Sequence, residues 1–192
     1  MVQRGGEMSM KYFNARNVIG TVVVLLSCAT ISIAQEGPDP AQVSAMKKLD
    51  FLTGKWKGSG WIFVRGGKRR TFGEMENIGW KAGGLVMTID GKGKARNPSK
   101  GKERSVHNAF TVVSYDRAGG YRWGAFLSTG QSTVAHGHLE SANTFVWEME
   151  IPQMGTMRYT IKINGNKWDE TAARSTNGKK WIPFFGMALT RQ

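Results

Sequence analysis

Ten short segments of alternating apolar and polar residues, all after Phe51, constrain the fold of this chain most strongly. Glycine and asparagine turn residues such as Gly66-Gly67 and Asn164-Gly165-Asn166 separate most of them. Such spacing is typical of consecutive antiparallel strands with short connections. The segments are Lys55–Val64, Arg70–Trp80, Gly84–Gly91, Arg104–Tyr115, Tyr121–Ser128, Ser132–Glu140, Thr144–Ile151, Thr156–Asn164, Lys167–Arg174 and Lys180–Arg191.

The alternation is clearest late in the chain. Phe145, Trp147 and Met149 fall on one face of a strand, and Glu148 and Glu150 fall on the other. One buried face and one wet face are what an antiparallel sheet needs. We therefore predict an all-β fold, a single closed up-and-down barrel of about ten strands, with a two-sheet sandwich as the alternative.

The N-terminal region has the pattern of an export signal. Basic residues at Arg4, Lys11 and Arg16 precede an apolar run over 18–26, and Ser32-Ile33-Ala34 fits a small-x-small cleavage site. This order of regions is typical of a secretory signal peptide. We predict a signal peptide over residues 1–34 and a periplasmic or secreted protein.

Cys28 allows a second interpretation of the same region. Leu25-Leu26-Ser27-Cys28 is similar to a bacterial lipobox, in which Cys28 would be lipidated. Because Cys28 is the only cysteine, a mature chain that begins after Ala34 would contain no thiol, and neither a disulfide nor a cysteine metal site could form.

One short helix is predicted before the barrel. Asp39 is a candidate N-cap, with Pro40 at the first helical position and Gln42 three residues after the cap. Val43, Met46 and Leu49 follow at helical spacing. We assign residues 35–46 to a linker and the start of this helix, and residues 47–192 to the barrel.

The first predicted strand carries a family resemblance. Gly54-Lys55-Trp56-Lys57-Gly58-Ser59-Gly60 resembles the opening strand of lipocalin-like (calycin) barrels, and its G-x-W-x-G-x-G form resembles that of the haem-binding nitrobindins. The end of the chain, from Trp168 to Arg191, is similar to that of exported bacterial lipocalin-like domains of unknown function. The resemblance implies structural roles for two residues: Trp56 would cover the closed end of the barrel, with Arg191 packed over its ring.

Haem and metal ions are not predicted as cofactors. The nitrobindin resemblance implies an iron-ligating histidine close to the C-terminus, but the last histidine here is His138. Only His107, His136 or His138 could substitute. His136 and His138 lie on one side of a strand and could form half of a metal site, but alternation with Ala135 and Leu139 places them on the wet face.

Three carboxylates share faces with apolar residues. Glu74 and Glu76 alternate in step with Ile78, and Glu170 falls on the face of Trp168. Inside a barrel they could bind a ligand or perform acid–base chemistry, whereas a bulge would present them to water. The predicted ligand-binding residues combine these acids with inward aromatic and apolar side chains: Trp123, Phe145, Trp147, Met149, Tyr159, Trp168, Glu74 and Glu170.

The basic residues, which give a net charge of +13, gather in predicted loops at one end of the meander. We predict a cationic rim at the barrel entrance, and a long mobile loop over 91–104 within it. Such a rim would attract anionic amphiphiles or lipid headgroups. Nucleic acid is not an expected partner, because the aromatic residues occupy core positions instead of alternating with the charges. The rim residues are Arg65, Lys68, Arg69, Arg70, Lys92, Lys94, Lys102 and Arg104.

Three functions are compatible with this pattern. The first is an exported barrel that binds a small hydrophobic or amphiphilic molecule in its lumen. The second is a haem-binding protein or acid–base enzyme of nitrobindin-like type, although no catalytic residue is predicted. The third is a ligand-free structural or interaction barrel filled by its own side chains. The sequence leaves the ligand and the oligomeric state open.

Overall fold

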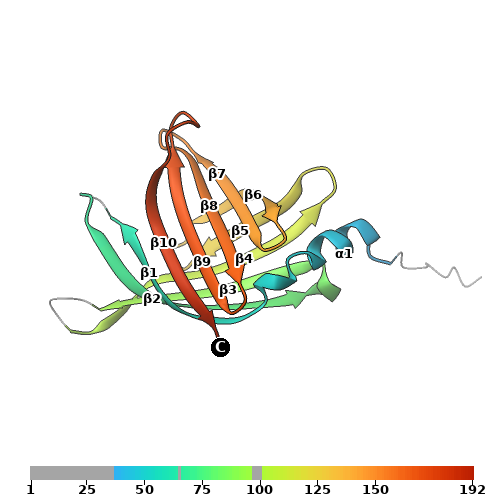
Figure 1. Ribbon diagram of the computed structural model, residues 1–192, viewed down its shortest axis with the longest axis horizontal. Coiled ribbons are helices and arrows are strands. Elements are labelled where there is room, and N and C mark those ends of the chain that lie inside the picture. Colours follow the sequence, from blue (N-terminus) through green and yellow to red (C-terminus); the bar gives the residue numbers. More distant parts are fainter. Residues whose placement is uncertain (1–36, 65, 97–100) are drawn as a thin grey trace, which may run out of the picture. The chain divides into compact units, whose positions relative to one another are not determined.

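A closed ten-stranded antiparallel barrel, preceded by a short helix, makes up the folded part of the chain (Figure 1). The computed structural model describes residues 37–64, 66–96 and 101–192. The predicted signal peptide over 1–34, with Cys28, and the rim residue Arg65 lie outside the described residues. The predicted all-β barrel is confirmed, and the sandwich alternative is wrong, because β1 pairs with β10 and closes the sheet.

The strands follow one another around the barrel in chain order. Each pairs with its neighbours in sequence, so the topology is an up-and-down meander. Trp56 of β1, for example, is opposite Glu76 of β2 on one side and Arg191 of β10 on the other. The strands are β1 (Gly54–Phe63), β2 (Arg69–Lys81), β3 (Val86–Arg96), β4 (Glu103–Asp116), β5 (Gly120–Leu127), β6 (Ser132–Ser141), β7 (Thr144–Ile151), β8 (Gly155–Asn164), β9 (Lys167–Ser175) and β10 (Ile182–Arg191).

The predicted loop over 91–104 is wrong in its extent. β3 continues to Arg96 and β4 begins at Glu103, so most of this segment is paired strand. Gly91 and Gly93 are buried and face the lumen, whereas Lys92 and Lys94 are exposed on the outer face. The glycine and lysine composition is typical of a loop, but here it is the inside–outside alternation of a strand.

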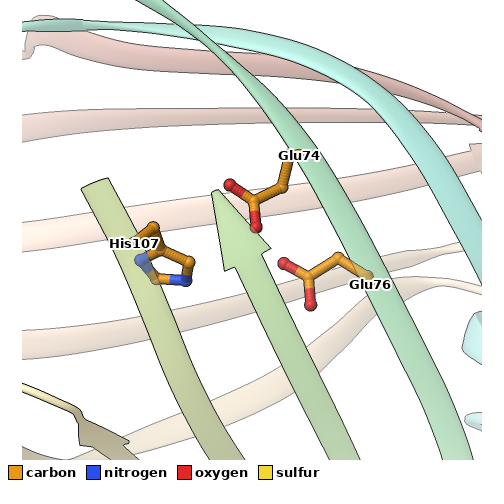
Figure 2. A group of neighbouring side chains, drawn as sticks. All are labelled: Glu74, Glu76 and His107. Carbon is orange, nitrogen blue, oxygen red and sulfur yellow. The ribbon is translucent and has the colours of Figure 1, made fainter. Parts of the chain in front are cut away.

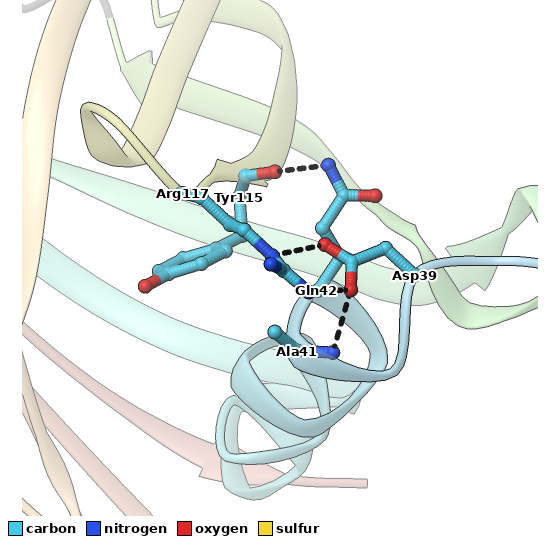
Figure 3. Close-up of polar contacts among 5 residues, drawn as sticks. All are labelled: Asp39, Ala41, Gln42, Tyr115 and Arg117. Carbon is cyan, nitrogen blue, oxygen red and sulfur yellow. Dashed lines mark hydrogen bonds and ion pairs between the residues drawn. The ribbon is translucent and has the colours of Figure 1, made fainter.

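The helix α1 (Pro40–Lys47) docks beside β4 through polar contacts (Figure 3). Asp39 caps it by accepting a hydrogen bond of 3.0 Å from the Ala41 amide, and it also pairs with the Arg117 guanidinium. Gln42 donates to the Tyr115 carbonyl at 3.2 Å and so ties the helix to the barrel. Within the described part of the chain, no helix is long and apolar enough to cross a membrane.

The apolar face of this N-terminal segment closes one end of the barrel. Met46, Leu49 and Leu52 are fully buried, and Leu52 belongs to the short 3₁₀ helix η1 (Asp50–Leu52). Val43, predicted on the same face, is 36% exposed. The Tyr121 hydroxyl of β5 donates to the Ala45 carbonyl at 2.7 Å and fixes the helix from the barrel side.

Trp56 and Arg191 complete the closed end. The Trp56 ring is buried, and its Nε1 donates to the Leu52 carbonyl at 2.9 Å. The Arg191 guanidinium lies 4.0 Å from the Trp56 ring centroid and donates to the carbonyls of Thr53 and Phe51. Through these contacts Arg191 of β10, the last strand, is held against β1, the first strand.

Candidate functional site

Exposure of the inward-facing side chains differs between the two ends of the barrel. Near α1, Phe145, Ile161 and Leu189 are at most 2% exposed. The inward residues farther along the same strands, toward the β7–β8 and β9–β10 connections, are half-buried: Met149, Tyr159 and Phe185. The lumen is therefore packed at the α1 end, and solvent reaches inward side chains at the other end, which we call the mouth.

Flat aromatic rings form one wall of the lumen. Trp147 of β7 stacks on Tyr159 of β8 with 3.9 Å between ring centroids and an interplanar angle of 3°. Trp123 of β5 continues the stack at 5.0 Å and 11°, and Phe145 lies 5.8 Å beyond Trp123. The Trp147 Nε1 is buried and has no hydrogen-bond partner among the described residues. The wall thus offers parallel ring faces and one free donor.

Three buried carboxyl groups lie in the lumen. Glu74 and Glu76 come from β2 and Glu170 from β9, and they are 3%, 9% and 8% exposed. The alternative in which a bulge turns Glu74 and Glu76 to water is wrong, because β2 pairs with β1 and β3 without a register shift. Glu170 accepts a hydrogen bond of 3.2 Å from the Trp168 Nε1.

Burial and mutual repulsion change the protonation of these groups. Desolvation and then the charge of Glu170 raise the pKa of Glu74 to about 8. Desolvation raises the pKa of Glu76 well above its ordinary value, and Glu74 and Glu170 add to this. Burial also raises the pKa of Glu170 to about 7, although the Trp168 hydrogen bond opposes the shift. Burial therefore favours the protonated form of Glu74 and Glu76 at neutral pH, whereas Glu170 gains or loses its proton in that range.

His107 of β4 completes a cluster with Glu74 and Glu76. One ligand atom of each of the three side chains lies within 4.8 Å of the others. Figure 2 shows the two carboxyl groups and the imidazole directed toward one another, with β3 between their strands. Burial lowers the pKa of His107, which favours the neutral imidazole.

The structure separates the predicted ligand-binding residues into two groups. Phe145 and Trp168 belong to the packed end, where Trp168 meets Trp56 edge to face with centroids 5.5 Å apart. The remaining aromatic and apolar residues lie nearer the mouth: Trp123, Trp147 and Tyr159 are stacked in the wall described above, and Met149 is half-buried on the same strand as Trp147. Their position relative to the mouth could not be obtained from alternation alone.

The histidines also separate. His136 and His138 are exposed on the outer face of β6, while Ala135 on the same strand is buried. His107 is the histidine that faces the lumen. Its place beside Glu74 is not visible in the sequence, because strand register and not spacing along the chain brings the two residues together: Gly93 is opposite both.

The structure describes all of the predicted rim residues except Arg65, and those that it describes are exposed. Exposed residues next to the β1–β2 and β3–β4 connections are Lys68, Arg69, Arg70, Lys102 and Arg104. Lys92 and Lys94 lie on the outer face of β3 instead of in a loop, and Lys92 pairs with Asp90 at 3.2 Å. A surface hollow of about 430 Å³ opens over this part of β1–β3.

Comparison with known proteins identifies the fold and nothing finer. No family model matches the chain, and no curated protein matches it. The chain is similar to the crystal structure of Rv2717c from M. tuberculosis, with a TM-score of 0.56 and 16% sequence identity, over 77% of this chain and 97% of that one. At this identity the likeness shows a shared barrel fold.

Proposed function

We propose that this protein is a lipocalin-like barrel that binds a small hydrophobic or amphiphilic molecule at the mouth of its lumen. The observation that carries the proposal is the gradient of exposure along the inward faces, which leaves Met149, Tyr159 and Phe185 half-buried above a packed base. Ligands of barrel proteins bind where inward apolar side chains meet solvent.

The chemistry of the wall indicates the class of ligand. The parallel rings of Trp123, Trp147 and Tyr159 suit a flat apolar group. A buried donor without a partner, here the Trp147 Nε1, is costly unless a bound molecule or water accepts its hydrogen bond. A ligand with a ring and one acceptor atom would satisfy both features.

Charge around the mouth supports an amphiphilic ligand or a lipid surface as the source of that ligand. Lys68, Arg69, Arg70, Lys102 and Arg104 are exposed there. Clustered cations of this kind steer anionic headgroups toward an entrance by long-range attraction. The proposal includes export to the periplasm or the medium, on the signal-like pattern of residues 1–34.

Haem is a less suitable ligand for this lumen. Axial ligation needs an imidazole aimed at the ring-binding surface. His107, the inward histidine, lies beside Glu74 and Glu76, and Trp123 of the neighbouring β5 is opposite Val113, six residues farther along β4. We expect no shifted Soret band when hemin is added to the purified protein.

A fluorescence titration with N-phenyl-1-naphthylamine, a neutral flat probe, tests the proposal. We expect saturable one-site binding, with energy transfer from tryptophan. Tyr159→Leu removes a stacked ring face and should weaken binding about tenfold, the equivalent of about 1.4 kcal/mol. Phe126→Leu is the matched control, because Phe126 is 53% exposed on the outer face of β5.

The two variants separate the outcomes. Loss of probe binding in Phe126→Leu but not in Tyr159→Leu would place the probe on the outer surface and refute lumen binding. No saturable binding by the native protein, with no small molecule retained in native mass spectrometry, would favour the ligand-free barrel.

A further inference from the structure

A second feature of the lumen is a cluster of polar side chains from β2 and β4. Glu74 and Glu76 of β2 and His107 of β4 converge, with one oxygen or nitrogen atom of each within 4.8 Å of the others. The two strands that carry these side chains, β2 and β4, do not pair with each other, because β3 lies between them (Figure 2). Their convergence therefore needs an explanation in β3.

Glycines in β3 provide the space. A Cβ at Gly91 would lie 2.7 Å and 2.9 Å from the two Glu76 carboxyl oxygens. A Cβ at Gly93 would lie 2.5 Å from Glu74 Oε2 and 2.7 Å from the His107 Cβ. Any other residue at these two inward positions would separate the side chains of β2 and β4. Because Gly91 and Gly93 have no side chains, the three groups can approach one another across the inner face of β3.

The buried oxygens at the centre of this cluster lack partners. Glu74 Oε1 and Glu76 Oε2 are both buried without a hydrogen bond in the described part of the chain. Glu74 is 3% exposed, and no described arginine or lysine forms a salt bridge with it or with Glu76. Two adjacent buried carboxyl groups with unpartnered oxygens are costly, because a protonated carboxyl still needs hydrogen-bond partners and an ionised one needs a cation or a metal ion.

We propose that Glu74, Glu76 and His107 bind one divalent transition-metal ion, of the class of Zn²⁺, inside the barrel. Two carboxylates balance the charge of the ion, and an imidazole favours zinc and its neighbours over Mg²⁺ and Ca²⁺. Three protein ligands leave at least one coordination position for water or a bound molecule. The site goes beyond the proposed function, because the aromatic wall does not contribute to it.

Metal analysis of the purified protein tests this assignment. The protein is treated with EDTA, exchanged into metal-free buffer, incubated with Zn²⁺ and passed through a desalting column. We expect one zinc per chain by mass spectrometry. Co²⁺ in place of Zn²⁺ should give visible absorption bands. Mg²⁺ and Ca²⁺ added in parallel should not compete, and equal retention of either would overturn the assignment to a transition metal.

Ligand variants identify the residues that hold the ion. Glu74→Gln and His107→Gln each keep side-chain bulk and should weaken zinc binding about 100-fold, as the loss of a direct ligand exceeds the effect of second-sphere changes. The double variant His136→Gln/His138→Gln removes exposed imidazoles from the outer face of β6 and is the matched control. Loss of zinc in this control but not in His107→Gln would overturn the proposal.

A glycine variant tests the geometry without removal of a ligand. Gly91→Ala places a methyl group against the Glu76 carboxyl, which is the far end of a flexible side chain, and we expect zinc binding about tenfold weaker with the fold retained. Gly73→Ala is the control, since its Cβ would meet the nearest atoms only at 3.8 Å. Circular dichroism establishes that each variant is folded. Equal zinc affinity in Gly91→Ala, Glu74→Gln and the native protein would refute the metal site. Probe binding that is retained in zinc-free protein would show that the proposed ligand site in the lumen does not depend on the metal.

Discussion

Replacement of Glu170 by glutamine should stabilise the barrel at alkaline pH and not at acid pH. Glu170 is 8% exposed, and burial raises its pKa from the ordinary 4.5 to about 7. Below pH 4.5 the carboxyl is protonated in both the folded and unfolded states and contributes no pH dependence. Between pH 4.5 and 7 the unfolded state loses its proton first, so the free energy of unfolding falls as pH rises.

The magnitude follows from the two pKa values. Above pH 7 the difference between 4.5 and about 7 corresponds to about 3 kcal/mol of lost stability. Glutamine cannot ionise, and its side-chain oxygen can still accept the hydrogen bond from the Trp168 Nε1. For a domain of this size, about 3 kcal/mol corresponds to a rise of about 6–12 °C in Tm.

Differential scanning calorimetry at pH 4 and pH 8.5, on EDTA-treated protein, measures the effect. We expect Glu170→Gln to melt close to the native protein at pH 4 and well above it at pH 8.5. Asp169→Asn, on the exposed face of the same strand, is the control and should change Tm little at either pH. An equal shift for Glu170→Gln at both pH values, or a lower Tm at pH 8.5, would refute the assignment of a buried acid.

Three further predictions, two substitutions and one salt titration, concern the closed end and the rim. Leu49→Ala should lower the free energy of unfolding by about 2–5 kcal/mol in denaturant titration, because a fully buried leucine leaves a cavity under α1. Arg191→Met should cost about 1–3 kcal/mol in the same assay, since the Thr53 and Phe51 carbonyls and the Trp56 ring lose a charged partner. The on-rate of the anionic probe 1-anilinonaphthalene-8-sulfonate should fall as salt rises, while that of N-phenyl-1-naphthylamine should not; equal salt dependence in stopped flow would argue against a steering rim.

Alternation predicted the strands because inward and outward positions differ in polarity along the late part of the chain. Phe145, Trp147 and Met149 against Glu148 and Glu150 fix the face of β7, and the turns on either side fix its length. A polar residue on an apolar face is also visible in the sequence, which is how Glu74, Glu76 and Glu170 were selected. Closure itself depends on the pairing of β1 with β10, which no local pattern contains.

The position of His107 could not be predicted for a related reason. Its distance from Glu74 along the chain carries no information, and the pairing register that joins them depends on a shift beside Gly93 in the β3–β4 pair. The distance of each inward residue from the mouth also depends on how the strands pair. Trp168 and Trp147 are equally apolar positions in the sequence, but strand direction places the first beside Trp56 at the packed end and the second in the wall.

The stretch from Gly91 to Lys94 shows why amino-acid composition predicted a loop where the structure has a strand. Glycine and lysine are each depleted in strands, so together they predict a loop. In β3 the two residue types serve different faces: Lys92 and Lys94 carry charge on the outside, and Gly91 and Gly93 leave room inside for Glu76, Glu74 and His107. A glycine pair costs strand stability, so a barrel that needed only a packed core would gain from alanine or valine at both positions. Their presence opposite two buried acids is the feature of this molecule that packing alone does not explain.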